Sequence, residues 1–323
     1  MRQHRVCIVG GTGFVGHAIA AKLAAAGHQV RILSRQPQRH KDLLVLPTAH
    51  LRACNPYDVN SLVFSLKGYD VVINLVGILN EPGRSGKGYE LSHVRLTEAV
   101  VAACQRVGVS RYLHMSALHA DEAAPSHYLR SKARAEKIAL AAHSRSLRVT
   151  VFRPSVIFGP QDSFINRFAS LLKMSPALFP LAGAWAKFQP VYVGDVAQAF
   201  VNAMDNPSAY GKAFELCGPR AYSLEQLLRY IADELGYRTR IIPLGRLLSR
   251  MQAELFEWMP PPFNRYKPFS VDNYRSLTVD SVCNSGFPEV LGIKPVSLEA
   301  MAPTWLGKTV CDLYSCYRVE AGR

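Results

Sequence analysis

The chain has 323 residues and lacks the features that mark a disordered or membrane-spanning protein. Only 19% of its residues are charged, and 49% are hydrophobic, which excludes a disordered basic tail protein. No uninterrupted apolar run reaches the roughly 18 residues that a membrane span requires. The length corresponds to about two domains, enough to bury a core without disulfides or metals.

Cysteine is sparse and shows no paired spacing. The seven cysteines are an odd number, and no Cys-x-x-Cys pair indicates a zinc knuckle or a thioredoxin-type redox site. This usage is typical of a reducing compartment. Met1–Arg5 lead directly into the apolar stretch Val6–Val9, so we expect no signal or transit peptide. These features predict a cytoplasmic protein.

Acidic residues are too few to balance the basic ones. There are 38 Lys and Arg against 24 Asp and Glu, a net charge of +14. The excess leaves nucleic acid, an anionic membrane surface or a phosphorylated ligand open as partners. No nucleic-acid motif or aromatic–basic platform accompanies it, so we expect no nucleic acid partner. A peripheral position on the inner membrane stays open as an alternative location.

Short β-branched runs alternate with helical patterns in the first half, which predicts a parallel sheet with crossover helices. Strands are expected at Val6–Val9, Val30–Leu33, Leu51–Ala53, Val71–Leu75, Tyr112–Met115 and Val149–Phe152. Helices are expected over Gly16–Ala26, Leu91–Val107 and Tyr128–Ala142. We therefore predict an α/β fold, a Rossmann-type doubly wound parallel sheet followed by a smaller C-terminal substrate or lid domain.

The composition of the chain changes after Pro154, where prolines cluster and the expected loops become longer. We expect a first domain over residues 1–154, a substrate or lid region over 155–303 and a tail over 304–323. Elements near residues 189–204 are expected to return to the first domain. Within the second region, Ser223 and Gln226 form a capping box that predicts the start of a helix.

A glycine-rich loop follows the first expected strand. Gly10, Gly13 and Gly16 have the spacing of loops that bind a dinucleotide pyrophosphate, and Phe14 and Val15 lie between them at the helix start. Glycines allow the backbone to approach phosphate, and the helix N-terminus offers free N–H groups. Strand, glycines and helix occur in the required order, so we predict that these five residues bind a dinucleotide. A glycine-rich turn without a ligand is the alternative.

The end of the second strand indicates which dinucleotide binds. NAD sites usually place a carboxylate here for the ribose 2′-hydroxyl. This chain has Ser34 and Arg35 instead, with Arg39 and Lys41 just beyond. A guanidinium pairs with a 2′-phosphate, which a carboxylate would repel. We predict NADP(H) rather than NAD(H), with a solvated basic loop as the alternative, and the first domain is therefore the expected NADP-binding domain.

Tyr128 and Lys132 are four residues apart at the start of an expected helix, which places the phenol and the ammonium on one face. A tyrosine titrates at about pH 10, and a nearby ammonium would stabilise its phenolate and lower that pKa. We therefore predict an acid–base pair, with Lys132 also binding the cofactor ribose.

Ser116, at the end of the fifth strand, is the expected third catalytic residue, because its hydroxyl could bind a substrate carbonyl. A capping serine is the alternative. His114, His119 and His127 lie nearby without recognisable ligand spacing, so we expect no metal site.

With these motifs in place, the chain resembles the extended and atypical short-chain dehydrogenases, a group similar to NAD-dependent epimerases and dehydratases. The resemblance covers nearly the whole chain before the C-terminal tail. In particular, the chain resembles the short-chain-dehydrogenase-like accessory subunit of respiratory complex I and its bacterial relatives. The segments that carry the resemblance are Asn74–Gly77, Tyr128–Lys132, Arg153–Pro160, Phe158–Ala169, Lys187–Val193 and Gln189–Ala197.

The resemblance implies that Asn74, Val76, Gly77 and Pro154 line a tightly held NADPH. It also implies a peripheral position near a membrane and quinone. Active members of the family usually have a serine doublet where this chain has Met115-Ser116-Ala117. An asparagine often lies where this chain has His93.

Two functions follow from these features. The first is an NADP(H)-dependent oxidoreductase, or a related epimerase- or dehydratase-like enzyme, acting on a small or lipophilic, quinone-related substrate. The second is a catalytically quiet, NADPH-loaded accessory or assembly protein of respiratory complex I or quinone metabolism. We favour the enzyme, because a chain freed from catalysis has no physical need for Tyr128 and Lys132 together. An NADP-binding redox sensor is a third class without specific support.

Apolar residues also recur at helical spacing in the second half, between residues 244 and 263. A helix packed in the core of the lid domain is the favoured interpretation. The alternative is an amphipathic surface that contacts a membrane or a partner subunit. The pattern consists of Leu244, Leu247, Leu248, Met251, Leu255, Phe256 and Met259, with Arg246 and Arg250 between them and Trp258 before a triple proline.

Overall fold

The computed structural model describes residues 3–81, 83–257 and 269–307. The chain forms two compact units, each built from more than one segment. Unit 1 consists of Met1–Pro154, Val193–Leu216 and Ser285–Lys294. Unit 2 consists of Ser155–Tyr192, Cys217–Asn284 and Pro295–Arg323.

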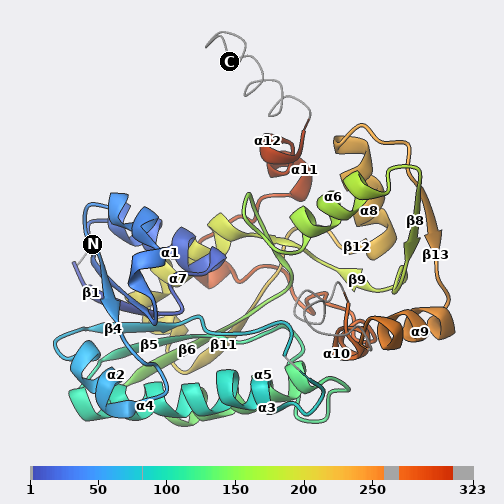
Figure 1. The fold of residues 1–323 in the computed structure, drawn as a ribbon. Coiled ribbons are helices and arrows are strands. Elements are labelled where there is room, and N and C mark those ends of the chain that lie inside the picture. Colours follow the sequence, from blue (N-terminus) through green and yellow to red (C-terminus); the bar gives the residue numbers. More distant parts are fainter. Residues whose placement is uncertain (1–2, 82, 258–268, 308–323) are drawn as a thin grey trace, which may run out of the picture. The chain divides into compact units, whose positions relative to one another are not determined.

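The centre of unit 1 is a seven-stranded parallel sheet with the strand order β11-β6-β5-β4-β1-β2-β3 (Figure 1). The six strands expected from the sequence are confirmed, with slightly different ends. The strands are β1 (Arg5–Val9), β2 (Gln29–Ser34), β3 (Ala49–Ala53), β4 (Val71–Asn74), β5 (Arg111–Met115), β6 (Arg148–Pro154) and β11 (Lys212–Leu216).

The seventh strand, β11, was not predicted. It pairs in parallel with β6 at the edge of the sheet, and only Leu216 of its five residues is fully buried. An edge strand of this kind lacks the continuous apolar run that reveals a central strand. In β1, by contrast, every residue from Val6 to Val9 is at most 1% exposed, because helices cover both faces of the sheet.

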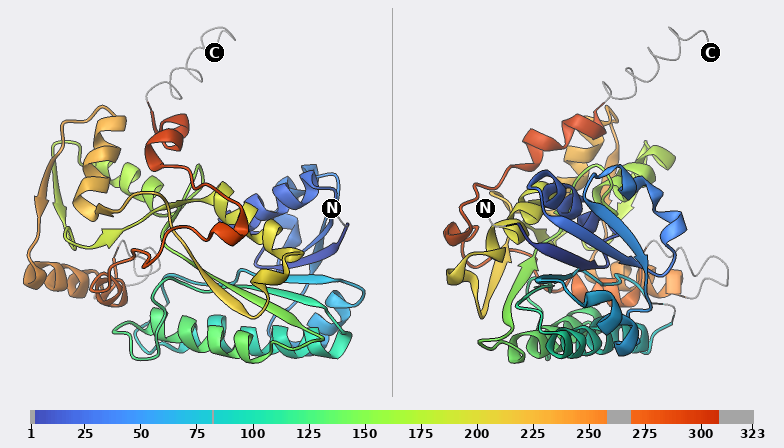
Figure 2. Two further views of the ribbon diagram at one scale, coloured as in Figure 1. Left: turned by 180° about the vertical axis from the view of Figure 1, so that it is seen from behind. Right: turned by 90° about the vertical axis from the view of Figure 1, so that its left-hand side faces the viewer.

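Helices α1 (Phe14–Ala25) and α7 (Val193–Met204) pack together on one face of the sheet (Figures 1 and 2). Helices α2 (Val59–Leu66), α4 (Leu96–Val107) and α5 (His127–Ala141) cover the other face. The predicted Rossmann-type doubly wound sheet is therefore confirmed. Strand order reverses on the two sides of β1, and sheets of this type bind ligands at the carboxyl edge beside such a reversal.

The helix leading into α4 contains an irregular stretch. Lys87–Tyr89 are α-helical (α3), Glu90–Arg95 form a π-helical segment (η3), and α4 continues to Val107 before Gly108. Insertions of this type widen a helix by one residue and occur frequently at functional sites.

Within its described residues, unit 2 contains three small two-stranded sheets and several helices. The confirmed capping box of Ser223 and Gln226 starts α8. The strand pairs are β7 (Ile157–Phe158) with β10 (Val191–Tyr192), β8 (Leu178–Leu181) with β13 (Arg240–Pro243) and β9 (Lys187–Phe188) with β12 (Tyr222–Ser223). The helices are α6 (Ile165–Met174), α8 (Leu224–Glu234), α9 (Arg246–Glu257), α10 (Val271–Ser276), α11 (Leu298–Met301) and α12 (Pro303–Leu306).

Cys217 and Cys283 of unit 2 form a disulfide across 66 residues of sequence. This pair departs from the expectation of reduced thiols, and nothing in the cysteine spacing indicates it. The side chain of Gln189 joins the same two segments, since it donates to Gly218 O and accepts from the Cys283 N–H. Cys7, Cys54 and Cys104 are buried free thiols, while Cys311 and Cys316 lie outside the described residues.

Helix α9 corrects the favoured interpretation of its apolar pattern. Leu247 is 72% exposed and Leu255 is 69% exposed, and Leu248 and Met251 are also more than half exposed. The helix buries a different face, formed by Ser249, Ala253 and Glu257. Met259, Trp258 and the triple proline lie outside the described residues. No helix in the described ranges is long and apolar enough to cross a membrane.

Candidate functional site

The glycine loop lies at the carboxyl end of β1 and starts α1. Gly10 has a φ of +82°, a left-handed conformation that glycine adopts without strain. A Cβ at Gly16 would lie 2.5 Å from the backbone of Gly11, so loop and helix can approach this closely only without a side chain there. The first N–H groups of a helix have no intrahelical acceptor, and no side chain at the N-cap Gly13 caps them. The N–H groups of Phe14, Val15 and Gly16 are therefore available to an anion.

The end of β2 is basic. Ser34 is buried and its Oγ accepts a hydrogen bond from Gln36 N at 3.1 Å. Arg35 is exposed, and no acidic side chain of the described residues forms an ion pair with it. Asp42 in the same loop lies 2.8 Å from His17 Nε2, and this hydrogen bond holds the pKa of the carboxyl below its usual range. The Asp42 carboxylate is therefore hydrogen-bonded to a residue of α1.

The loop after β4 contains Asn74, Val76 and Gly77. Asn74 is 1% exposed; its Nδ2 donates to Tyr112 Oη at 3.2 Å, and its Oδ1 accepts from Val76 N. The polar atoms of the asparagine side chain therefore form hydrogen bonds within the protein, and these bonds hold the conformation of the loop. The backbone of Val76 and Gly77 follows the carboxyl end of β4, next to the glycine loop: a Cβ at Gly10 would lie 3.0 Å from Val76 N.

Lys132 reaches this loop from α5. Its Nζ donates to Met115 O at 3.1 Å, and a Cβ at Gly77 would lie only 2.9 Å from Nζ. The side chain is 4% exposed, and burial lowers the pKa of its ammonium to about 8. The ammonium therefore lies at the carboxyl edge of the sheet, between the ends of β4 and β5.

Tyr128 lies one helical turn before Lys132. Its ring is in edge-on contact with Tyr89 and His93, with ring centroids 6.1 and 5.6 Å away. Burial raises the pKa of its phenol to about 12. The expected lowering by Lys132 is absent, because burial alone shifts the pKa of the phenol and Lys132 does not contribute to it. Both groups are thus shifted toward their neutral forms.

Ser116 directly follows β5, and Pro154 is the last residue of β6, at the same edge of the sheet. Ser116 is 3% exposed, and its Oγ is buried without a hydrogen-bond partner in the described residues. Pro154 O accepts from Leu118 N at 3.0 Å. A buried hydroxyl without a hydrogen-bond partner lowers the stability of the fold unless a ligand or a water molecule forms a hydrogen bond with it. The structure thus brings to one edge the glycine loop, Ser34, the loop after β4, Ser116, Pro154 and the Lys132 ammonium.

Two of the histidines near the site, His114 and His127, contact other side chains. His114 is buried beside Asn74 and Tyr112, and burial lowers its pKa to about 3. His127 accepts from Arg130 Nη2 at 3.1 Å through its Nδ1. In the part of the chain that the structure describes, no three His, Cys, Asp or Glu side chains are grouped as metal ligands.

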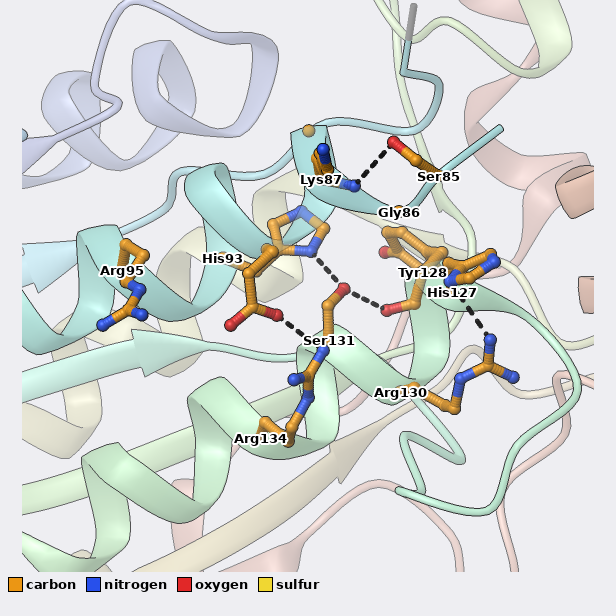
Figure 3. A network of polar contacts seen from close by, with 12 residues as sticks. Ser85, Gly86, Lys87, His93, Arg95, His127, Tyr128, Arg130, Ser131 and Arg134 are labelled. Carbon is orange, nitrogen blue, oxygen red and sulfur yellow. Dashed lines mark hydrogen bonds and ion pairs between the residues drawn. The ribbon is translucent and has the colours of Figure 1, made fainter. Parts of the chain in front are cut away.

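One buried contact at the site was not expected from the sequence. His93 Nδ1 lies 2.8 Å from Ser131 Oγ, and Ser131 Oγ donates to Tyr128 O at 2.8 Å (Figure 3). The sequence marks His93 only as a departure from the family's asparagine, and no role is expected there for Ser131. The available signal was a polar residue, Ser131, on the helix face that Tyr128 and Lys132 share.

Comparison with known proteins identifies the family of the chain. Residues 6–217 match the NAD dependent epimerase/dehydratase family. NADH dehydrogenase (ubiquinone) 1 alpha subcomplex subunit 9, mitochondrial, from Rattus norvegicus is 31% identical over 309 residues, covering 90% of this chain and 77% of that protein. A 2-alkyl-3-oxoalkanoate reductase from Stenotrophomonas maltophilia is 26% identical over 257 residues, covering 72% of this chain and 76% of the reductase.

A solved structure supports the fold alone. The UDP-N-acetylglucosamine 4-epimerase from Methanobrevibacter ruminantium M1 superposes with a TM-score of 0.71 at 17% identity, covering 98% of this chain and 99% of that one. The family match extends over most of the chain and includes the glycine loop, Tyr128 and Lys132. The chain belongs to the NAD-dependent epimerase/dehydratase family.

Proposed function

We propose that the protein binds NADP(H) and reduces or oxidises a lipophilic carbonyl compound, with Tyr128 as the acid–base residue. The observation that carries this proposal is the Lys132 ammonium, kept dehydrated at the carboxyl edge of the sheet against Gly77. Burying a charged amine is costly, so its retention there indicates a role with a ligand. A cofactor ribose hydroxyl bound by Lys132 would give the ammonium a further acceptor beside Met115 O.

The preference for NADP(H) rests on the basic end of β2. Ser34 occupies the position where an NAD site usually has a carboxylate, and Arg35 is exposed beside it with Arg39 and Lys41 following. The Asp42 carboxylate pairs with His17 and so competes less with a 2′-phosphate for these cations. The glycine loop would hold the pyrophosphate through the N–H groups of Phe14, Val15 and Gly16.

The acid–base chemistry follows from the same residues. NADP(H), when bound, would supply or accept the hydride at the substrate carbon. In carbonyl reduction, Tyr128 Oη donates its proton to the substrate oxygen, while Ser116 Oγ donates a hydrogen bond to that oxygen. Lys132 then stabilises the phenolate that forms, and in the oxidation direction the phenolate takes the proton back.

The second candidate is a catalytically quiet, NADPH-loaded accessory protein of a respiratory or quinone-pathway assembly. The similarity to a protein named as a subunit of NADH dehydrogenase (ubiquinone) favours it. This function requires the cofactor site and the fold but not the phenol of Tyr128.

Tyr128→Phe separates the two functions. For an enzyme we expect NADPH affinity within about threefold of wild type and a loss of turnover of about 10²–10⁴-fold, since only the proton donor is removed. Complementation of a deletion strain, together with NADPH titration of the purified variant, measures both. Full complementation by Tyr128→Phe would contradict the enzyme and favour the accessory function.

The substrate can be identified from what the protein retains. We expect mass spectrometry of the purified protein to find NADP(H) at close to one equivalent, together with a quinone or another lipophilic compound. Co-purification of NAD(H) alone would contradict the proposal of NADP(H). Apo protein reconstituted with each nucleotide serves as the reference for the measurement.

We also propose that the exposed apolar face of α9 gives the protein a peripheral contact with an anionic membrane, with the rest of the protein in the cytoplasm. Four exposed apolar side chains flank Arg246 and Arg250, a combination typical of helices that lie on anionic lipid. We expect Leu247→Ser/Leu255→Ser to reduce flotation with anionic vesicles by at least about tenfold. Val45→Ser, at the end of the exposed 3₁₀ helix Lys41–Val45 of unit 1, is the control, and equal flotation of all variants would contradict the contact.

A further inference from the structure

One buried imidazole joins the loop after β4 to the helix that carries the tyrosine and the lysine. His93 Nε2 accepts a hydrogen bond from Ile78 N at 3.1 Å. On its other side, His93 Nδ1 contacts Ser131 Oγ, which donates to Tyr128 O (Figure 3). A continuous chain of hydrogen bonds thus runs from the residue after Gly77 to the first turn of α5.

The directions of these bonds fix the proton on His93. A backbone N–H can only donate, so Nε2 of His93 is unprotonated. Nδ1 therefore carries the proton and donates to Ser131 Oγ, whose own proton is directed to the Tyr128 carbonyl. The side chain is 1% exposed, and burial together with the charge of Lys132 lowers its pKa to about 2. The imidazole is neutral in one tautomer and is not an acid–base group at neutral pH.

Two neighbouring contacts support the same connection. Tyr89 Oη donates to Leu79 O at 3.0 Å, which ties the loop again to the residue that precedes the π-helical segment. Glu90 pairs with Arg134 at 2.6 Å, one turn along both helices from the contact between His93 and Ser131. Segment 89–93 therefore holds the loop on one side and α5 on the other.

The spacing between loop and helix has little tolerance. A Cβ at Gly77 would lie 2.9 Å from Lys132 Nζ and 3.5 Å from His93 Nε2, so all three groups meet at one point. If the loop moved outward, water would reach Lys132, and if it moved inward, it would collide with the ammonium.

We infer that His93 is a positioning residue that sets the spacing between Gly77–Ile78 and α5, and thereby keeps Lys132 dehydrated and aligned with Tyr128. The inference rests on the proposed function, in which the cofactor contacts Lys132 at this edge. The role of His93 is to supply one acceptor and one donor at a fixed separation, without adding charge beside the ammonium.

The first test is NMR spectroscopy of the full-length protein with labelled histidine and lysine side chains. We expect His93 as the Nδ1–H tautomer, with no titration between pH 5 and 9, a range that includes the ordinary histidine pKa of about 6.5. In His93→Ala, water entry should raise the pKa of Lys132 by about one unit or more. His93→Gln, whose amide also offers an acceptor and a donor, should restore the wild-type value, and Ser131→Ala should show a smaller rise.

Val100→Ala is the matched control, because Val100 is fully buried on α4 and contacts neither Lys132 nor the loop through a hydrogen bond. It should lower thermal stability as His93→Ala does, while the Lys132 pKa stays at the wild-type value. If His93→Ala does not fold, the pKa of Lys132 in Ser131→Ala tests the inference. An unchanged Lys132 pKa in the folded His93 and Ser131 variants, or a His93 that titrates near its ordinary pKa, would overturn the inference.

NADPH titration provides the second readout. We expect His93→Ala to weaken NADPH binding about tenfold, as for loss of a buried hydrogen-bond partner, and His93→Gln to recover to within about threefold. If wild-type protein binds no NADPH, the proposed function fails, while the Lys132 pKa series still decides the role of His93. If NADPH binds and neither variant changes its affinity or the Lys132 pKa, His93 has no positioning role.

Discussion

Arg35→Asp is expected to weaken NADPH binding by about 100-fold and to leave NADH binding within about threefold of wild type or tighter. The substitution removes a guanidinium that would pair with the 2′-phosphate and places a carboxylate where it repels that group. Loss of a charge-assisted hydrogen bond and the new repulsion together correspond to about 3 kcal/mol, or roughly 100-fold. The new carboxylate can instead accept from the 2′-hydroxyl of NADH. Fluorescence titration with both nucleotides measures the change.

Arg106→Asp is the control for net charge, because it alters the charge by the same amount near the end of α4, where the residue is exposed. We expect it to leave both affinities nearly unchanged at physiological salt. If both variants lost NADPH affinity equally, Arg35 would act through the general positive charge of the protein and not through a contact with the 2′-phosphate. Unchanged NADPH affinity in Arg35→Asp would exclude the assignment of the end of β2 to a 2′-phosphate.

Lys132→Met is expected to reduce NADPH affinity by about 100-fold and at the same time to stabilise the cofactor-free protein by about 2 kcal/mol at pH 7. Burial lowers the pKa of Lys132 from 10.5 to about 8, so charging it in the folded state costs about 3 kcal/mol. The lost hydrogen bond to Met115 O offsets about 1 kcal/mol of this gain. Urea unfolding and NADPH titration of the same preparations measure the two effects.

The pH dependence of unfolding gives an independent check on Lys132. Because its folded pKa lies below its unfolded pKa, the unfolded state binds more protons between pH 8 and 10.5, and stability rises with pH across that window. This stability is lost again as the pH falls through about 8. Lys132→Met should lose this rise, whereas Lys137→Met, an exposed lysine on the same helix, should keep it. If Lys132→Met destabilised the protein, the proposed cost of burying the ammonium would be contradicted. If its NADPH affinity were unchanged, the proposed contact between Lys132 and the cofactor would be contradicted.

Much of the sheet and the conformation of the glycine loop could be predicted because these features depend on short-range patterns. Strands such as β1 and β4 are buried on both faces and appear as uninterrupted apolar runs. Gly10 and Gly16 are needed by the local backbone, through a positive φ and a close approach to Gly11. The half-exposed edge strand β11 has no such signal, and it was missed for that reason.

Side-chain environments could not be predicted in the same way. The i, i+4 spacing of Tyr128 and Lys132 correctly places them on one face, but it predicted a lowered tyrosine pKa where burial raises it to about 12. Helix α9 shows the same difficulty, because its periodicity identifies an apolar face without indicating whether another element covers it. The structure leaves Leu247 and Leu255 exposed and buries Ser249 and Ala253.

The amino-acid sequence by itself determined the parallel sheet, the glycine loop and the basic residues beyond β2, and with them the expectation of a phosphorylated dinucleotide. Backbone preferences and residue order along a few turns are sufficient for these features. Only the tertiary structure decided that Lys132 is buried against Gly77, that His93 connects Ile78 to Ser131, and that Cys217 forms a disulfide with Cys283. Each of these contacts joins segments separated by 15 to 66 residues, and their formation depends on how the whole unit packs.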